Sequence, residues 1–305
     1  MLLVCRFWIA DGLVIRKTRI RNQSPQMFKR NCCVCLARES PDMARMANWL
    51  RAVIPKELRP IGYIEKLVRA KTGSRVAGGP FEGMRYTDDT VGSAYVPKLL
   101  GIYERELNGC IERACSLNFP VIVDVGAAEG YYAIGMALRN PEAKVVAFEM
   151  EAKGRSLMGQ MARENQVSHQ VEIRGRCEPE DLAAVLANHD RALVICDVEG
   201  YEDILLNPQA SPQLGRCHLL VEMHDFIIPN ITERISERFA PSHSVGRIWQ
   251  EPRMRSDLPY RSLGLSLLPG RYLDWAVSEW RPVRMSWLWA VPKSGEGKTS
   301  DHHDS

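Results

Sequence analysis

The residues best suited to hold a small ligand form a strand–turn–helix pattern at 121–132. A short β-branched run leads to Asp124, and a turn bearing Gly126 and Gly130 then opens a helix. Glycine lets the backbone turn tightly and approach a ligand without a Cβ in the way. The first turn of the helix offers free N–H groups to a ligand carboxylate. The pattern predicts a cofactor site that includes Asp124, Gly126, Ala127, Gly130 and Tyr131.

A second acid, Glu149, follows the next apolar run at 145–148. An acid at the end of the second strand can accept hydrogen bonds from both ribose hydroxyls of a nucleoside, on the sheet edge where ligands bind in such folds. A nicotinamide dinucleotide site is the rival, but it requires G-x-G-x-x-G, whereas Ala128 stands two positions after Gly126. Asp124 and Glu129 would also lie beside a pyrophosphate, while the sulfonium and amino group of S-adenosylmethionine tolerate acidic neighbours. We therefore predict S-adenosylmethionine as the cofactor.

A second constellation follows the fourth and fifth predicted strands. Asp197-Val198-Glu199-Gly200-Tyr201-Glu202 comes after the apolar run Leu193–Cys196, and Glu222-Met223-His224-Asp225 comes after Cys217–Val221. The acids and His224 are expected to converge on one pocket, because parallel strands end at one edge. Methyl transfer to a hydroxyl requires close in-line placement and a base for the departing proton. We predict as catalytic residues Asp197, which also borders the cofactor, Glu199 and His224.

Other interpretations of this constellation remain open. His224 or one of the carboxylates can serve as the base. The carboxylates and imidazole can instead hold a divalent metal that lowers the pKa of the hydroxyl; we do not predict one. Glu202 and Asp203 also fit solvated residues at a helix start, and His224 also fits a hydrogen-bonded structural histidine.

The elements that position these residues alternate between strand and helix. Strands that alternate with helices at this spacing indicate right-handed crossovers and a parallel sheet. We predict a Rossmann-like α/β fold, a mainly parallel seven-stranded sheet with helices on both faces. The predicted strands are Val121–Val125, Lys144–Phe148, Val171–Arg174, Ala192–Cys196, Cys217–Val221, Ser244–Trp249 and Ser286–Val291, and the helices are Tyr131–Leu138, Ala152–Asn165, Glu180–Asn188 and Asn230–Phe239.

The domain organisation follows from composition and periodicity. We expect a poorly ordered leader at 1–42, an N-terminal helical cap at 43–118, the cofactor-binding domain at 119–293 and a disordered tail at 294–305. Within the cap, apolar residues at helical spacing from Tyr95 to Ala114 predict one continuous helix that ends at Asn118-Phe119-Pro120. The segment Pro252–Leu268, rich in Arg, Pro and Ser, is predicted to be a long loop near the active face.

Composition excludes several classes of protein. The net charge of +3 is too small to indicate a nucleic-acid partner. Nine scattered cysteines, an odd number, favour a reducing cytoplasm over secretion, and Cys32, Cys33 and Cys35 lack a second pair at zinc-site spacing. No apolar run reaches the roughly 20 residues needed to span a bilayer. We expect a cytoplasmic enzyme without a membrane partner, and the sequence leaves its oligomeric state open.

Two stretches, Val123–Tyr132 and Asp197–Glu202, resemble the FkbM-type S-adenosylmethionine-dependent methyltransferases. The resemblance covers roughly 121–221 and implies methyl transfer, commonly to oxygen on sugars or natural products. It implies that Asp124, Gly126, Gly130 and Glu149 line the cofactor, with Asp197 and Glu199 at its junction with the substrate.

The sequence departs from that family at Ala128-Glu129, where members more often have Asn and an apolar residue, and at Glu222-x-His224-Asp225. These departures bear on the acceptor more than on the cofactor. The prediction is an O-methyltransferase that acts on a small-molecule or sugar acceptor. The alternatives are a methyltransferase-like module that binds without catalysis and a nicotinamide-dependent Rossmann oxidoreductase.

Overall fold

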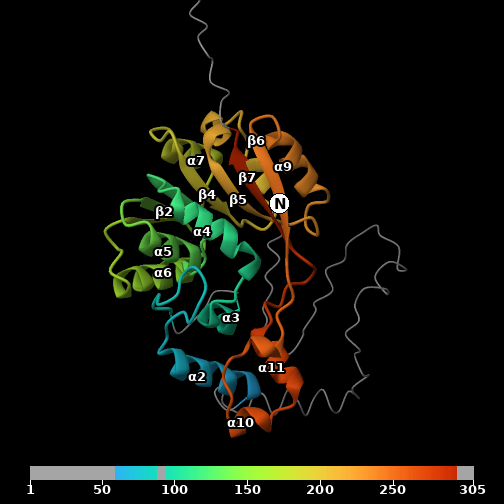
Figure 1. Cartoon of the computed structure of the whole chain (residues 1–305). Coiled ribbons are helices and arrows are strands. Elements are labelled where there is room, and N and C mark those ends of the chain that lie inside the picture. Colours follow the sequence, from blue (N-terminus) through green and yellow to red (C-terminus); the bar gives the residue numbers. More distant parts are fainter. Residues whose placement is uncertain (1–58, 88–93, 294–305) are drawn as a thin grey trace, which may run out of the picture.

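The computed structural model in Figure 1 describes residues 59–87 and 94–293 of the chain. The predictions for the leader at 1–42 and the tail at 294–305 fall outside these ranges. Within them, every helix is too short or too polar to cross a lipid bilayer.

A seven-stranded sheet forms the centre of the molecule, with the strand order β3-β2-β1-β4-β5-β7-β6. All strands run in one direction except β7, which is antiparallel to both β5 and β6. Strand β1 is the run of β-branched residues around Asp124 and is buried along its whole length, as expected for a central parallel strand. The predicted fold class is confirmed. The strands are β1 Val121–Val125, β2 Lys144–Phe148, β3 Val171–Arg174, β4 Ala192–Cys196, β5 His218–Met223, β6 His243–Trp249 and β7 Ser286–Pro292.

Helices cover both faces of this sheet (Figure 1). One face packs against α4 (Asn108–Ser116), α5 (Tyr131–Arg139) and α6 (Ala152–Glu164). The other packs against α7 (Pro179–Leu186), α8 (Glu202–Leu205) and α9 (Ile231–Phe239). The two cores take alternate residues of each strand: Ile122 belongs to the first and Val121 and Val123 to the second.

A cap on the first of these faces joins segments from both halves of the chain (Figure 1). The helices α2 (Pro60–Thr72) and α3 (Tyr95–Leu100) contact α11 (Gly270–Val277), which lies between β6 and β7. The predicted loop Pro252–Leu268 contains the short helices η4 (Arg255–Asp257) and α10 (Leu263–Ser266), and the sequence did not predict α11. This insertion is helical because its apolar residues are buried against the rest of the cap. These residues are Leu265, Ala276 and Val277.

The single helix predicted from Tyr95 to Ala114 is wrong. The structure breaks it into α3, the 3-10 turn η2 (Arg105–Leu107) and α4. Gly101 ends α3 with a φ of +72°, and a Cβ at that position would lie 1.9 Å from the carbonyl oxygen of Gly78. The backbone approach of the segment around Gly78 therefore stops the helix, although the apolar spacing continues past it.

Candidate functional site

The carboxylates form one row across four neighbouring strands. The register pairs Val125 with Phe148 and Cys196, and Cys196 with Val221. One residue further along, the row runs through Glu149, Gly126 and Asp197, which directly follow β2, β1 and β4, and through Glu222 near the end of β5. The structure thus brings both predicted constellations to the carboxyl edge of the sheet.

Gly126 allows the first and fourth strands to come together at this edge. Its φ is +85°, and a Cβ there would lie 1.7 Å from the carbonyl oxygen of Asp197. The N–H groups of Gly126 and Ala127 both donate to the carbonyl of Phe148, at 2.9 and 3.0 Å. The turn after β1 is therefore fixed between its two neighbouring strands, and a side chain at Gly126 would push them apart.

Glu149 is held by backbone amides rather than by a cation. Its Oε2 accepts a hydrogen bond from Ala128 N–H at 2.8 Å, and its Oε1 accepts one from Glu151 N–H at 2.6 Å. Burial raises the pKa of this carboxyl, while the two amide hydrogen bonds lower it. Each carboxylate oxygen keeps a lone pair, so Glu149 can still accept hydrogen bonds from a diol.

Asp124 lies on β1, two residues before Gly126, and is 3% exposed. Burial raises the pKa of its carboxyl to about 7, against the lowering effect of a hydrogen bond from the Ala133 backbone, and the charges of Asp197 and Glu149 raise it further. Its Oδ2 has no hydrogen-bond partner within the described part of the chain. A buried carboxylate oxygen without a donor is costly, so this atom is suited to a cationic ligand group.

Glu129 is paired within the cap, although its charge still raises the pKa of Glu149 slightly. It is fully buried, and its Oε1 lies 2.6 Å from Lys98 Nζ of α3 and accepts a hydrogen bond from the Tyr86 hydroxyl. Its charge is therefore largely balanced within the cap. Gly130, the residue that follows, has a φ of +97° and packs against Met158 of α6.

Tyr131 contributes the first residue of α5, and its ring lies under the cap. The ring packs edge-on against Phe81 and Tyr103, with centroids 5.3 and 5.4 Å away. The side chain is 5% exposed. The backbone N–H at the start of the helix, rather than this buried ring, is therefore the part of Tyr131 available to a ligand.

On the other half of the edge, His224 meets the acids that follow β4. His224 Nε2 lies 3.5 Å from Asp197 Oδ1 and 3.4 Å from Glu199 Oε2. Its Nδ1 lies 2.7 Å from Oε1 of Glu202, a fully buried carboxylate. Glu202 is thus a buried partner of His224 and not a solvated residue at a helix start, whereas Asp203 is partly exposed and pairs with Arg238 at 2.7 Å.

The charge state of His224 follows from these contacts. Burial lowers the pKa of the imidazole, but the hydrogen bond that it donates to Glu202 and the charges of Asp197, Glu202 and Glu199 raise it more, to about 9. The imidazole therefore carries a proton at neutral pH. In this state it neutralises its acidic neighbours and cannot accept a proton from a substrate.

Glu222 is linked to the cap by a buried guanidinium. Arg281 forms ion pairs with Glu222 and Glu104 and lies 3.4 Å from Glu279. Burial and then the charge of Asp197 raise the pKa of Glu222 well above its usual range, although Arg281 lowers it. Arg253 extends the network by pairing with Glu279 at 2.9 Å and with Glu106 at 2.5 Å.

Sequence reasoning missed Arg281, Arg253 and Glu104 as parts of this half of the site. None belongs to a motif, and they reach it from the insertion between β6 and β7 and from the segment after α3. Glu202 did carry a signal, since it lies three residues after Glu199, on the first turn of a helix that faces β5.

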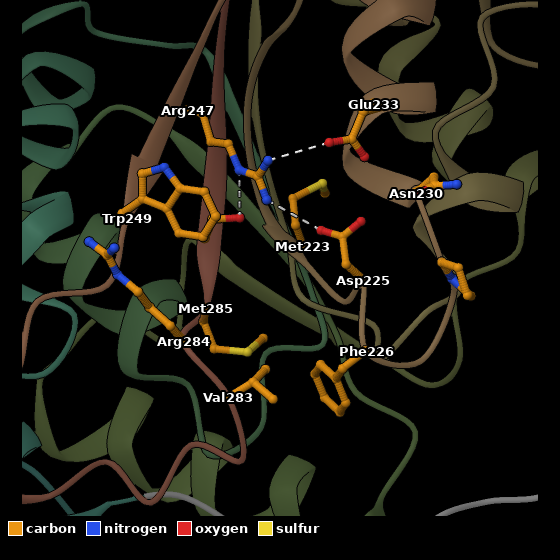
Figure 2. A pocket seen from close by; sticks show the side chains of 12 residues that line it. Met223, Asp225, Phe226, Asn230, Glu233, Arg247, Trp249, Val283, Arg284 and Met285 are labelled. Atoms are coloured by element: carbon orange, nitrogen blue, oxygen red, sulfur yellow. Dashed lines mark hydrogen bonds and ion pairs between the residues drawn. The ribbon is translucent and has the colours of Figure 1, made fainter. Parts of the chain in front are cut away.

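Asp225 does not join the cluster. Its Oδ1 accepts a hydrogen bond from Thr232 N–H at 3.2 Å, and its Oδ2 pairs with Arg247 at 3.4 Å. It is thus directed toward α9 and away from His224. Figure 2 shows it on the wall of a neighbouring cavity together with Arg247 and Glu233.

This cavity of about 340 Å³ lies beside the His224 cluster and not above the turn after β1. Figure 2 shows apolar and aromatic side chains among the lining residues, beside charged ones, and Phe226, Trp249 and Val283 are 40%, 42% and 46% exposed. Phe226 connects it to the cluster, because its ring lies 5.9 Å from the ring of His224. The volume is at the small end of the range for sites that bind small molecules.

No protein-family model matches the chain, and no curated protein matches it. Among solved structures, the O-methyltransferase TomG from Streptomyces achromogenes, in complex with SAM, is 16% identical over 82% of this chain and 96% of its own, with a TM-score of 0.41. A precorrin-6y C5,15-methyltransferase from Geobacter metallireducens is 11% identical over 60% of this chain and 88% of its own, with a TM-score of 0.41. The tRNA methyltransferase TrmK from B. subtilis is 13% identical over 60% and 65%, with a TM-score of 0.36.

These similarities are too low to carry an argument about activity. The fold is established by the strand order and directions described above, and the function has to be argued from the site.

Proposed function

We propose that this chain is an S-adenosylmethionine-dependent methyltransferase of the FkbM type, which methylates an oxygen of a small-molecule or sugar acceptor. The observation that carries the proposal is the row of Glu149, Gly126, Asp197 and Glu222 along the carboxyl edge of the sheet. Ligands of open α/β sheets bind at this edge. The resemblance of the stretches 123–132 and 197–202 to that family supports the same conclusion.

The residues of the first half fit the cofactor. Glu149, fixed by two amides, would accept hydrogen bonds from the ribose hydroxyls. Asp124 Oδ2, buried without a donor, would face the amino group of the methionine part. The first N–H groups of α5, ahead of the Ala133 N–H that donates to Asp124, would bind its carboxylate. When bound, the cofactor supplies a methyl group made electrophilic by a sulfonium.

A dinucleotide fits the same edge poorly. Its pyrophosphate would bring negative charge toward Asp124 and Asp197, and Lys98, whose charge acts on Asp124, already pairs with Glu129 at 2.6 Å. Placing the negative pyrophosphate next to buried carboxylates is electrostatically unfavourable, because like charges repel strongly in a buried site. The electrostatics therefore favour a cofactor that carries positive charge.

Methyl transfer forms a bond between the acceptor oxygen and the methyl carbon while the carbon–sulfur bond breaks and its electron pair returns to sulfur. The acceptor hydroxyl must lose its proton. Asp197 is the best-placed acceptor of that proton, because its buried Oδ1 has no hydrogen-bond partner within the described ranges and it borders the turn at Gly126. His224, protonated at neutral pH, would hold Asp197 and Glu199 in place.

The cavity beside Phe226 and Trp249 supports a small acceptor. Its volume of about 340 Å³ suits one sugar or aromatic ring rather than a macromolecule. Aromatic side chains at its mouth offer apolar surface for stacking against such a ring. Phe226 lines this cavity and its ring lies 5.9 Å from the ring of His224, so an acceptor seated there would lie next to the His224 cluster.

Titration of the purified full-length chain tests the proposal. We expect S-adenosylmethionine and S-adenosylhomocysteine to bind with micromolar affinity and NAD not to bind. Asp124→Ala and Glu149→Ala should weaken binding at least tenfold, while Glu142→Ala, at an exposed acid before β2, should leave it unchanged. Unchanged binding in the first two variants, or tighter binding of NAD, would overturn the assignment. Binding without formation of S-adenosylhomocysteine from any sugar or natural-product acceptor would show a binding module instead.

A further inference from the structure

Three side chains on the acceptor half of the edge face one common point. These are Asp197, Glu199 and His224, and the ligand atoms that they offer all lie within 4.8 Å of one another. We propose that Asp197, Glu199 and His224 Nε2 bind a divalent cation of the Mn²⁺ and Mg²⁺ class, which holds and activates the acceptor oxygen. This proposal rests on the proposed function for its role, but the binding of the ion stands on geometry alone.

The imidazole is oriented as a metal ligand requires. Its Nδ1 lies 2.7 Å from Glu202 Oε1, so Nε2 is the ring atom that points toward the carboxylates. Glu202 is fully buried and also accepts hydrogen bonds from the N–H groups of Val198 and Gly200, both at 3.3 Å. Histidines that bind metals commonly have their second nitrogen held by a carboxylate in this way.

The distances leave room for an ion. Nε2 lies 3.4 Å from Glu199 and 3.5 Å from Asp197, whereas a charge-assisted hydrogen bond is about 2.7–2.9 Å long. Ligands about 2.1 Å from one ion lie about 3–4 Å apart when they are neighbours or opposite each other. The spacing of Nε2 from both carboxylates therefore fits ligands of a shared ion better than a closed ion pair.

The buried His224 ring and one buried oxygen of the Asp197 side chain, which is 41% exposed as a whole, border this gap without a good partner. His224 is 2% exposed, and its Nε2 has the two long contacts described above. Asp197 Oδ1 is buried and has no hydrogen-bond partner among residues 59–87 and 94–293. Binding of an ion displaces the Nε2 proton to water, and the ion then satisfies both atoms. The Glu199 side chain is 73% exposed, so the gap is open to solvent on that side.

The donor set selects the kind of ion. Two carboxylates and one imidazole, without a thiolate, favour an oxygen-preferring ion that tolerates nitrogen, which describes Mn²⁺ and to a lesser degree Mg²⁺. Three protein ligands leave about three positions of an octahedral ion for water and the acceptor. A hydroxyl bound there has a lowered pKa. Its proton passes to water, and Asp197 then acts as a ligand rather than as the base.

Metal binding can be measured directly on the full chain after treatment with EDTA. Titration with Mn²⁺, followed by electron paramagnetic resonance, should show one strongly bound ion per chain, which Mg²⁺ displaces. Glu199→Gln, at an exposed side chain that the fold does not need, should lower Mn²⁺ affinity at least tenfold, and Asp197→Asn should do the same. Asp225→Asn, at the acid directed toward α9, serves as the matched control and should leave the affinity unchanged.

The proposal would be overturned if the unsubstituted chain bound Mn²⁺ no more tightly than the Glu199→Gln variant, or bound no stoichiometric Mn²⁺. Titration of the same samples with S-adenosylhomocysteine separates the two claims. If the nucleoside binds and Mn²⁺ does not, the metal site is wrong and the proposed function stands. If Mn²⁺ binds and the nucleoside does not, the proposed function fails while the metal site stands.

Discussion

The two halves of the carboxyl edge stabilise their acids in different ways. On the β1–β2 half, Glu149 accepts hydrogen bonds from the backbone amides of Ala128 and Glu151, and Asp124 accepts one from Ala133. On the β4–β5 half, Glu222 depends on the side chain of Arg281, which comes from the insertion before β7. The first half is therefore built from nearby backbone, and the second from distant side chains.

This difference fits the proposal that the β1–β2 half binds the cofactor and the β4–β5 half binds the acceptor. Backbone amides hold a carboxylate in one position whatever the rest of the chain does, which suits a cofactor of fixed shape. Side chains supplied by the cap and the insertion can differ between related proteins without disturbing β1 and β2, which suits an acceptor that varies. The following predictions test whether the two halves are separate in this sense.

Replacement of the glycine between the halves should have the largest effect. In Gly126→Ala, the new Cβ would lie 1.7 Å from the Asp197 carbonyl oxygen in a backbone with a φ of +85°. We expect a loss of about 4 kcal/mol or more in the free energy of unfolding and no measurable cofactor binding. Chemical denaturation and calorimetric titration would measure both. Gly175→Ala, where a Cβ meets nothing within 4 Å, should change neither.

Removal of the buried guanidinium should damage the second half and spare the first. Arg281→Met leaves Glu222, Glu104 and Glu279 without their shared cation. Breaking a buried ion pair from one side costs about 3–5 kcal/mol, and this loss would be seen in urea denaturation. Where the variant remains folded, cofactor affinity should stay within about threefold. Loss of cofactor binding by a folded variant would contradict the separation of the halves.

A matched control uses an exposed arginine. Arg216→Met removes a contact of 3.5 Å to Asp190, a side chain that is 98% exposed. Exposed pairs contribute little to stability, so the free energy of unfolding should change by about 0.5 kcal/mol or less.

Glu149→Gln should affect the first half alone. The added NH₂ group would face one of the two amide donors and leave it unsatisfied, which costs about 1–3 kcal/mol. We expect S-adenosylhomocysteine affinity to fall about 10-fold to 100-fold, with Mn²⁺ affinity unchanged. Separate titrations with S-adenosylhomocysteine and with Mn²⁺ would measure the two affinities. An equal loss of both affinities would mean that the two halves act as one unit.

The smallest effect should be a pH dependence of cofactor affinity. Burial raises the pKa of Asp124 to about 7 in the folded protein, so below that pH the carboxyl is mostly protonated and cannot attract a cationic group. Binding should therefore strengthen as the pH rises, by about tenfold between pH 6 and pH 8. The same raised pKa means that Asp124 stabilises the fold most at low pH and loses this contribution as the pH rises toward 7.

Asp124→Asn removes the titrating group. Its cofactor affinity should be low and nearly constant over the same range, which calorimetry at several pH values would establish. A persistent tenfold pH dependence in this variant would assign the titration to another group.

The sequence predicted the sheet well because its strands are short buried runs whose periodicity is local. It failed where a contact between distant segments decided the structure. Gly101 ends a helix because the backbone around Gly78 lies against it, and α11 is helical because it packs on α2. Neither contact leaves a local pattern.

The same contrast holds for the site. Glu149 and the turn at Gly126 could be predicted, because their geometry follows from strand ends and glycine positions. Arg281 could not, since nothing near residue 281 indicates that it reaches Glu222 on β5. Lys98 likewise pairs with Glu129 from a distance of 31 residues, and no local pattern indicates this pair.

A crystal structure of the chain with bound S-adenosylhomocysteine tests the central claim most directly. We expect the ribose hydroxyls on Glu149, the amino group near Asp124 and the sulfur directed across Gly126 toward Asp197. Density for the nucleoside in the cavity beside Phe226 and Trp249, or with its ribose on the β4–β5 half, would contradict it.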